Sequence, residues 1–203
     1  MSTVSATVLT DRVWAPPSER SRAIARDAAL VIGFALVTAA LAQIEIRLSF
    51  TPVPITGQTL GVLLAGGALG SRRGGLSMLT YWAMGLIGLP FYAGGDGGWT
   101  NGTGATLGYF VGFVAAAAIV GHLAERRQDR TLSTSVAAMT LGSLVIYIFG
   151  AGWLAHDLNL PVANGDTNAL SLGVTPFLIG DVIKLALAGA LLPAAWALVD
   201  RRR

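Results

Sequence analysis

Cysteine is absent from the 203 residues, and charged residues make up only 12% of them. Without cysteine the chain can form no disulfides and has no thiolate chemistry and no cysteine metal sites. Soluble globular domains carry roughly 25% charged residues, whereas here the few charges lie between long uncharged runs and hydrophobic residues reach 53%. These proportions predict a polytopic membrane protein.

Long uncharged runs indicate helices that cross a bilayer. A hydrocarbon core of about 30 Å requires roughly 20 apolar residues in a helix, and the sequence offers six such segments. We therefore expect an all-α integral membrane protein with six transmembrane helices. The second should be short, because Pro52 and Pro54 precede it and glycines loosen its end. The other five are expected near residues 27–48, 75–93, 104–123, 134–155 and 174–198.

The two ends of the chain differ from these segments. Residues 1–20 are rich in Ser, Thr and Pro and lack the apolar core of a cleavable signal. We expect residues 1–26 to be a disordered cytoplasmic tail and residues 27–199 to form one six-helix membrane domain. Residues 200–203 are expected to be a basic cytoplasmic end.

Arginines cluster in alternate connections between the predicted helices. They precede the first helix, join the second to the third and the fourth to the fifth, and end the chain. By the positive-inside rule, these segments and both termini are cytoplasmic. On the opposite side only Arg47 is basic, and Lys184 lies within the sixth helix. The net charge of +3 therefore indicates orientation rather than a nucleic-acid partner.

Lys184, the only lysine, lies in an apolar segment three residues after Asp181. Residues at this spacing share a helix face, so the two charges can pair or can both face a ligand. Ionisable residues in membrane helices usually mark a functional site, although a purely structural ion pair is the alternative. A lysine suits a ligand carboxylate, and an aspartate suits ureido or amide N–H donors.

The predicted outer connections, residues 49–56, 90–103 and 156–176, should cover the same pocket as this pair. In the first of them, Thr56 and Gln58 are candidate ligand contacts; the alternative is a connection that prolines simply keep non-helical. Trp99 and Tyr109 flank a glycine-rich stretch and are the aromatic candidates, while the other aromatics are expected at the membrane interfaces.

Other classes of site find little support. The glycine-rich stretch lacks Gly-Lys-Ser/Thr, which excludes a P-loop. His122 and His156 are expected on opposite membrane sides, which argues against a two-histidine metal or catalytic site. Ser143 has no Gly-x-Ser-x-Gly elbow, so an intramembrane serine protease is disfavoured. We therefore predict no enzyme activity and no metal or cofactor. A stand-alone secondary transporter is an open alternative, although inverted repeats are not evident.

Small residues recur every four positions on the first predicted helix. Ala25, Ala29 and Gly33 form one row, and Ala35 and Ala39 form a second. Such rows allow another helix to approach closely. Spacing leaves open whether that helix belongs to this chain or to another protein.

Four segments of the chain form an ordered set of motifs. They are Thr51-Pro-Val-Pro-Ile-Thr-Gly-Gln-Thr-Leu-Gly-Val-Leu-Leu-Ala-Gly66, Gly85-Leu-Ile-Gly-Leu-Pro-Phe-Tyr-Ala-Gly-Gly95, Gly104-Ala-Thr-Leu-Gly-Tyr-Phe-Val-Gly-Phe113 and Gly180-Asp-Val-Ile-Lys184. Together they make residues 28–198 resemble the BioY family, the biotin-binding S components of energy-coupling factor (ECF) vitamin transporters. Two departures stand out: Ala105 and Leu107 replace a proline and a glycine of the family pattern, and the loop before them is unusual.

The resemblance implies a multi-pass subunit of a bacterial cell membrane that captures biotin at its outer face. Asp181 and Lys184 would contact biotin, and Asn101 and Thr106 join the candidate substrate-binding residues. Another vitamin or small acid is the alternative ligand.

The resemblance also implies partner proteins. ABC-type ATPases of an energy-coupling module would supply the energy, through a transmembrane coupling protein. Ala35 and Ala39 would dock on that coupling protein, with the Ala25 to Gly33 row as the other register.

Overall fold

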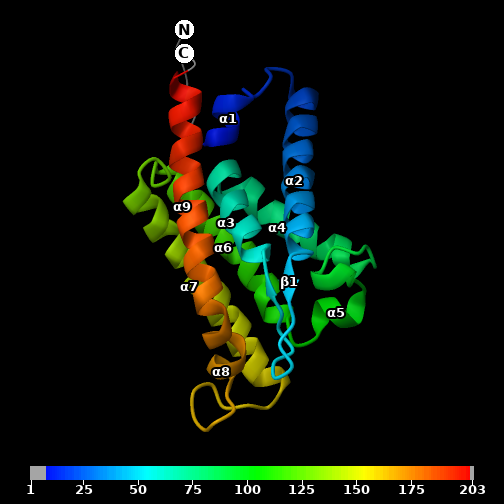
Figure 1. Ribbon diagram of the computed structural model, residues 1–203. Coiled ribbons are helices and arrows are strands. Elements are labelled where there is room, and N and C mark those ends of the chain that lie inside the picture. The colour runs from blue at the N-terminus through cyan, green and yellow to red at the C-terminus, as the bar shows by residue number, and fades with distance from the viewer. Residues whose placement is uncertain (1–7, 202–203) are drawn as a thin grey trace.

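The structure is a computed structural model that describes residues 8–201. Six helices dominate it (Figure 1), and a small antiparallel hairpin pairs β1 with β2. The principal helices are α2 (Arg20–Ala42), α3 (Gln58–Leu69), α4 (Ser71–Leu86), α6 (Leu107–Glu125), α7 (Leu132–Asp157) and α9 (Leu178–Arg201). The shorter elements are α1 (Leu9–Val13), β1 (Glu45–Ile46), β2 (Ile55–Thr56), η1 (Ala93–Gly95), α5 (Trp99–Thr103), α8 (Ala169–Gly173) and η2 (Thr175–Phe177).

Four helical segments are long and apolar enough to cross a membrane: Arg20–Ala42, Leu107–Glu125, Leu132–Asp157 and Ala169–Arg201. The helices α3 and α4 have 12 and 16 residues, or about 18 and 24 Å at 1.5 Å per residue. Both are shorter than a hydrocarbon core of about 30 Å. The chain is thus an all-helical protein of the multi-pass membrane class, and each of the six predicted segments overlaps one principal helix.

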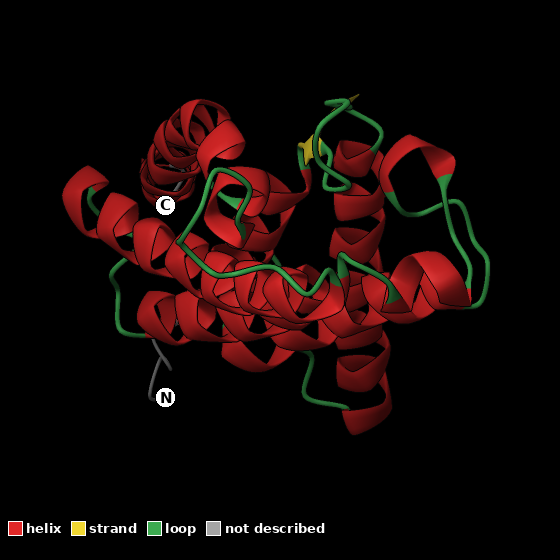
Figure 2. Ribbon diagram, turned by 90° about the horizontal axis from the view of Figure 1, so that it is seen from below, coloured by secondary structure: helices red, strands yellow, loops and turns green. Residues whose placement is uncertain are grey.

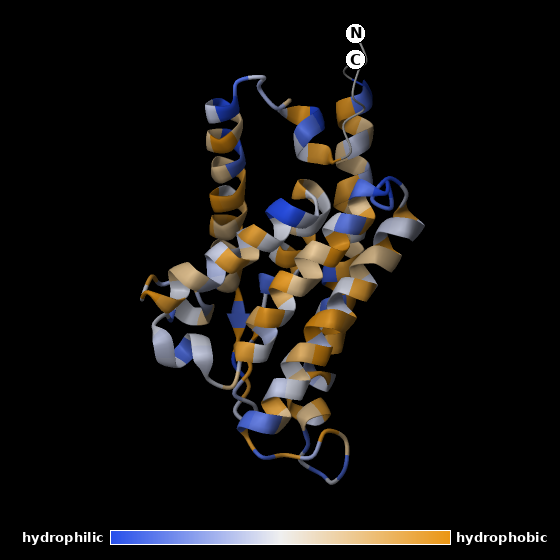
Figure 3. Cartoon of the chain, turned by 180° about the vertical axis from the view of Figure 1, so that it is seen from behind, coloured by the Kyte–Doolittle hydropathy of each residue, from blue (hydrophilic) through white to orange (hydrophobic). Residues whose placement is uncertain are grey.

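The bundle has two distinct ends. Helix α2 begins and α9 finishes at one end, together with α1, and we call this the terminal end (Figure 1). The hairpin, α8 and the 158–168 loop lie at the opposite end, which we call the distal end; Figure 2 views the bundle from this side. Hydrophobic residues prevail along the middle of the long helices (Figure 3). Ile148, Ile179 and Val182 are 71%, 81% and 66% exposed, as expected for side chains that face lipid.

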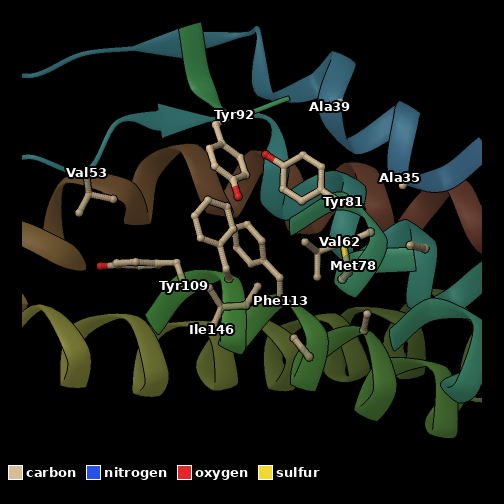
Figure 4. Packing of buried hydrophobic residues seen from close by; sticks show 14 of the residues in the cluster. Ala35, Ala39, Val53, Val62, Met78, Tyr81, Tyr92, Tyr109, Phe113 and Ile146 are labelled. Atoms are coloured by element: carbon tan, nitrogen blue, oxygen red, sulfur yellow. The ribbon is translucent and has the colours of Figure 1, made fainter. Parts of the chain in front are cut away.

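Helix α6 forms the centre of the bundle, packed against α3, α4 and α7. Glycines allow these close approaches: a Cβ on Gly108 would lie 2.3 Å from the carbonyl oxygen of Phe149 in α7. Toward the distal end, buried aromatic side chains fill the space between α4 and α6 (Figure 4). We call this set the aromatic group; it contains Tyr81, Tyr92, Phe110 and Phe113. The ring of Tyr92 lies 4.6 Å from that of Phe110, centroid to centroid. This aromatic group forms a rigid base beside the distal connections.

The first principal helix differs from its predicted range of 27–48. It begins at Arg20 and ends at Ala42, because the chain turns there into the hairpin, where Glu45 pairs with Thr56. The backbone N–H of Gly57 donates to the carbonyl oxygens of Leu41 (3.2 Å) and Ile44 (3.1 Å). These bonds satisfy carbonyls at the end of the helix and bring the start of α3 beside it.

The amino-terminal segment also differs from the expected disordered tail. Residues 1–7 of that tail lie outside the described part, but Leu9–Val13 forms α1, and the preceding Val8 is buried. Asp11 accepts two hydrogen bonds of 2.8 Å from Arg73 and one of 2.7 Å from the buried Arg26. Burial raises the pKa of Asp11, but these bonds outweigh it and lower the pKa below its usual value. Ion pairing therefore holds α1 against α2 and α4.

The first two residues of the expected basic end, 200–203, belong to a helix. Helix α9 continues through Arg201, and Asp200 pairs with Arg12 at 3.1 Å. Residues 202–203 lie outside the described part of the chain.

We expect Gly121→Ala to lower the midpoint of thermal unfolding. A Cβ at Gly121 would lie 2.3 Å from backbone atoms of both Gly70 and Ser71, which cannot move independently, and overpacking of this kind costs about 1–3 kcal/mol. Gly152→Ala is the matched control, because nothing lies within 4 Å of its added Cβ. Circular dichroism of detergent-solubilised protein measures both. Equal midpoints for the two variants would contradict this account of the α3–α4 junction.

Candidate functional site

A cavity of about 320 Å³ lies at the distal end, beneath the hairpin and between α3, α6, α7 and α9. Its volume falls within the range of small-molecule sites, roughly 300–1,000 Å³. Apolar walls come from residues such as Phe110, Phe113 and Ile146. The structure brings seven of the eight predicted substrate-binding residues to this cavity: Thr56, Gln58, Asn101, Thr106, Tyr109, Asp181 and Lys184.

The charged pair of α9 lies in the cavity wall. Lys184 Nζ lies 2.6 Å from Asp181 Oδ1, and the two side chains are only 13% and 7% exposed. The hydroxyl of Tyr147, from α7, donates a hydrogen bond to the other carboxylate oxygen, Oδ2. One buried carboxylate is thus bound from its own helix and from a neighbouring helix, which satisfies a charge that would otherwise be costly to bury.

The ammonium group of Lys184 has three oxygen neighbours. Besides Asp181, Nζ donates to the backbone carbonyl of Thr56 at 3.0 Å and to Thr59 Oγ1 at 2.8 Å. An ammonium group has three N–H donors, and two of them are used in these hydrogen bonds, while the contact with Asp181 is an ion pair without hydrogen-bond geometry. The sequence predicts that Lys184 contacts a ligand carboxylate, but in the structure such a carboxylate would lie beside the negative charge of Asp181.

Thr56 and Gln58 belong to a second polar chain. The hydroxyl of Thr56 donates to Gln58 Oε1 at 2.6 Å, and Gln58 Nε2 donates to the hydroxyl of Tyr81 at 2.5 Å. Tyr81 is completely buried within the aromatic group (Figure 4). A hydrogen bond from the hydrophobic core therefore holds Gln58, at the start of α3, in one orientation beside the cavity.

The predicted residues around the glycine-rich stretch have different environments. Tyr109 donates from its hydroxyl to the carbonyl of Gly173 at 2.7 Å and so joins α6 to α8. Asn101 donates to the carbonyl of Gly97 at 2.9 Å, and Thr106 donates to the carbonyl of Asn101 at 3.3 Å. These bonds shape the wall of the cavity. Trp99 is 72% exposed and does not line the cavity, because it begins the short helix α5 on the outside of this wall.

The cavity lining includes residues that are missing from the predicted set, among them Thr59, Tyr147 and Arg47. Thr59 directly follows Gln58 in the first motif, so its place in the sequence could have identified it as a cavity residue. Tyr147 was expected at a membrane interface, and only the packing of α7 against α9 brings it to Asp181. Arg47 was used only to assign orientation, although the hairpin places it in the cavity lining.

The predicted partner-docking residues are buried within this chain. Ala35 and Ala39 are 1% and 7% exposed and belong to the buried cluster (Figure 4). They face inward because α2 packs on α4. The other register, Ala25 and Ala29, is exposed, and nothing lies within 4 Å of a Cβ built on Gly33. This second row is therefore the one at the surface of α2.

A bundle of apolar helices with a partly polar cavity at one end defines a membrane protein that binds a small molecule. Residues 10–201 match the model of the BioY family, and the chain belongs to this family. It resembles the biotin transporter BioY of Rhizobium etli, with 40% identity over 174 residues, which cover 82% of this chain and 90% of that protein. The members of this family are transporters, so the chain is a transport protein and not an enzyme.

A second relative and one solved structure extend the comparison. The probable biotin transporter BioY of Pyrococcus horikoshii is 38% identical over 164 residues, 81% of this chain and 92% of that protein. The crystal structure of the S-component for biotin from an ECF-type ABC transporter has a TM-score of 0.76 and 25% sequence identity. That match covers 88% of this chain and 94% of the other, so the two chains share most of the fold.

We expect Lys184→Met to destabilise the unliganded protein. The substitution leaves the buried Asp181 without its cation, and breaking a buried pair in this way costs about 3–5 kcal/mol. The double variant Asp181→Asn/Lys184→Met should recover most of that loss, because an uncharged amide can still accept from Tyr147. Thermal unfolding in detergent, without ligand, measures both. A double variant no more stable than Lys184→Met would mean that the charge of Asp181 is not the cause.

Proposed function

We propose that this chain is the high-affinity biotin-binding membrane subunit of an ECF-type uptake transporter. The observation that carries the proposal is the cavity that contains the Asp181–Lys184 pair, together with Thr56 and Gln58. Biotin offers a ureido group with two N–H donors and a carbonyl, an apolar ring system and chain, and a carboxylate. The cavity offers a carboxylate, polar side chains and apolar walls that complement these parts.

Asp181 is the natural acceptor for a ureido N–H group. Its carboxylate is already bound by Lys184 and Tyr147, but each carboxylate oxygen can accept more than one hydrogen bond. Lys184 then acts chiefly as a positioning residue, which pairs with Asp181 and holds it in one orientation. Hydrogen bonds between a neutral donor and a charged acceptor contribute about 1.5–3 kcal/mol, which makes Asp181 the main polar anchor.

For the topology, we propose six membrane crossings, with both termini in the cytoplasm and the distal end outward. Contacts at the terminal end support this orientation, because Arg12 pairs with Asp200 and Arg73 pairs with Asp11. Basic segments that are distant in sequence thus gather on one side of the bundle, as the positive-inside rule requires of a cytoplasmic face. The membrane would be the cytoplasmic membrane of a bacterium, and biotin would enter from outside.

The energy for uptake would come from partner proteins. We propose that a transmembrane coupling protein, itself bound to ABC-type ATPases, docks on the exposed row formed by Ala25, Ala29 and Gly33. Small side chains allow a second helix to approach the backbone of α2 closely. Ala25 and Ala29 lie in the half of α2 nearer the terminal end, and no residue of the row lines the cavity, so docking and ligand binding would use separate surfaces.

Purified protein should bind biotin in preference to other vitamins. Isothermal titration calorimetry with biotin, thiamine, riboflavin and pantothenate tests this, with Asp181→Asn as the site control. Loss of the anionic acceptor should weaken biotin binding by roughly tenfold or more. Tighter binding of any of the other three ligands would assign the same fold to a different substrate.

Ala29→Trp should abolish assembly with the coupling module while the isolated subunit still binds biotin. A bulky side chain on the exposed row prevents close helix approach but lies far from the cavity lining. Ala186→Trp, on an exposed position of α9, is the matched control and should assemble normally. Co-purification and ATP-driven biotin uptake are the measurements. If Ala29→Trp assembles as well as the control, the docking surface lies elsewhere.

A further inference from the structure

Two basic side chains line the distal cavity among the described residues, and they differ in exposure. The side chain of Lys184 is 13% exposed, whereas that of Arg47 is 60% exposed. Arg47 follows β1 on the hairpin that covers the cavity. Lys184 is therefore an interior group, and Arg47 lies at the opening to solvent.

The interior cation is already surrounded by protein oxygens. Nζ donates to Thr56 at 3.0 Å and to Thr59 at 2.8 Å, and it forms an ion pair with Asp181 at 2.6 Å that lacks hydrogen-bond geometry. A ligand carboxylate at Lys184 would crowd these oxygens and would also lie beside the negative charge of Asp181. Like charges at such short range in a partly buried site are strongly disfavoured.

The guanidinium group of Arg47 is held in place by hydrogen bonds from two of its three nitrogen atoms. Nε donates to Glu45 at 3.0 Å, and Nη2 donates to the carbonyl of Ala93 at 3.3 Å and to Asp96 at 3.2 Å. Gly94 makes room for this arrangement, since its φ is +68° and a Cβ there would lie 2.3 Å from Nη2. The Nη1 group donates to no acceptor within residues 8–201. Its two N–H bonds are thus available in a fixed position.

We propose that Arg47 binds the carboxylate of the substrate at the mouth of the cavity, while the ureido ring lies inside against Asp181. The inference rests on the proposed function and assigns an orientation to the ligand: ring inward, acid outward. Arg47 would then be a specificity-determining residue that distinguishes the free acid from neutral derivatives. Such a group suits a carboxylate because its planar N–H donors match carboxylate oxygens.

Glu45 and Asp96 both orient Arg47 and oppose an incoming anion. The three side chains together carry a net charge of −1, so the carboxylate of the ligand must compete with two resident ones. This arrangement predicts a modest preference for the acid. It also predicts that Asp96→Asn, which removes one competitor, will strengthen binding of the acid and leave a neutral derivative unaffected.

The experiment compares biotin with biotinamide, its neutral amide, by calorimetry on the native protein and its variants. Native protein should bind biotin about tenfold more tightly than the amide, a value reduced by the exposure of Arg47. In Arg47→Gln this ratio should fall to about one through loss of acid affinity alone. Arg47→Lys should give an intermediate ratio, because it keeps the charge and loses the planar donors. Asp96→Asn should raise the ratio.

Three outcomes would overturn the inference. Equal native affinities for acid and amide would show that the carboxylate is not recognised. An unchanged ratio in Arg47→Gln, with a ratio near one in Lys184→Met, would place the carboxylate at Lys184. Equal losses of acid and amide in Arg47→Gln would show that Arg47 only supports the hairpin. Failure of native protein to bind either compound would instead overturn the proposed function, so the two failures are distinguishable.

Discussion

Accommodating a buried carboxylate inside a helical membrane bundle is the requirement on which the distal cavity depends. The side chain of Asp181 is 7% exposed, and burial of an isolated charge at such a position is costly. The lysine one turn later, the Tyr147 hydroxyl and the oxygens around Lys184 meet this requirement together. Because these partners come from α7, β2 and α3 as well as α9, one ion pair joins most of the elements that enclose the cavity.

Close packing of α6 positions these elements. Glycines on α6 bring it against the backbone of α7 and against the junction of α3 and α4. The aromatic group, which includes Tyr81, fills the space next to the cavity. The hydroxyl of Tyr81 in turn accepts a hydrogen bond from Gln58 and orients it. The polar residues of the site therefore depend on a rigid hydrophobic base. Preorganisation of this kind reduces the ordering that a ligand must impose and so favours tight binding.

Prediction from sequence succeeded where the signal is local. Uncharged runs located the principal helices, and the i, i+3 spacing of Asp181 and Lys184 indicated their pairing, which the structure contains. Ordered motifs indicated the BioY family, which the comparison with known proteins confirms. Sequence reasoning could not resolve features that depend on which distant segments meet. Ala35 and Ala39 are equivalent by spacing to Ala25 and Ala29, and only the packing of α2 on α4 distinguishes the buried row from the exposed one.

The membrane class, the approximate positions of the principal helices and the one interior lysine follow from composition or from spacing within a single helix. The side chains that complete the cavity follow only from how the segments pack together. Tyr147 reaches Asp181 from 34 positions away, and the hairpin brings Arg47 to Asp96 across 49 positions. Such contacts depend on how the helices pack and on the course of the connecting loops. Hydropathy and periodicity describe one segment at a time, so they do not identify the residue that each side chain contacts on another segment.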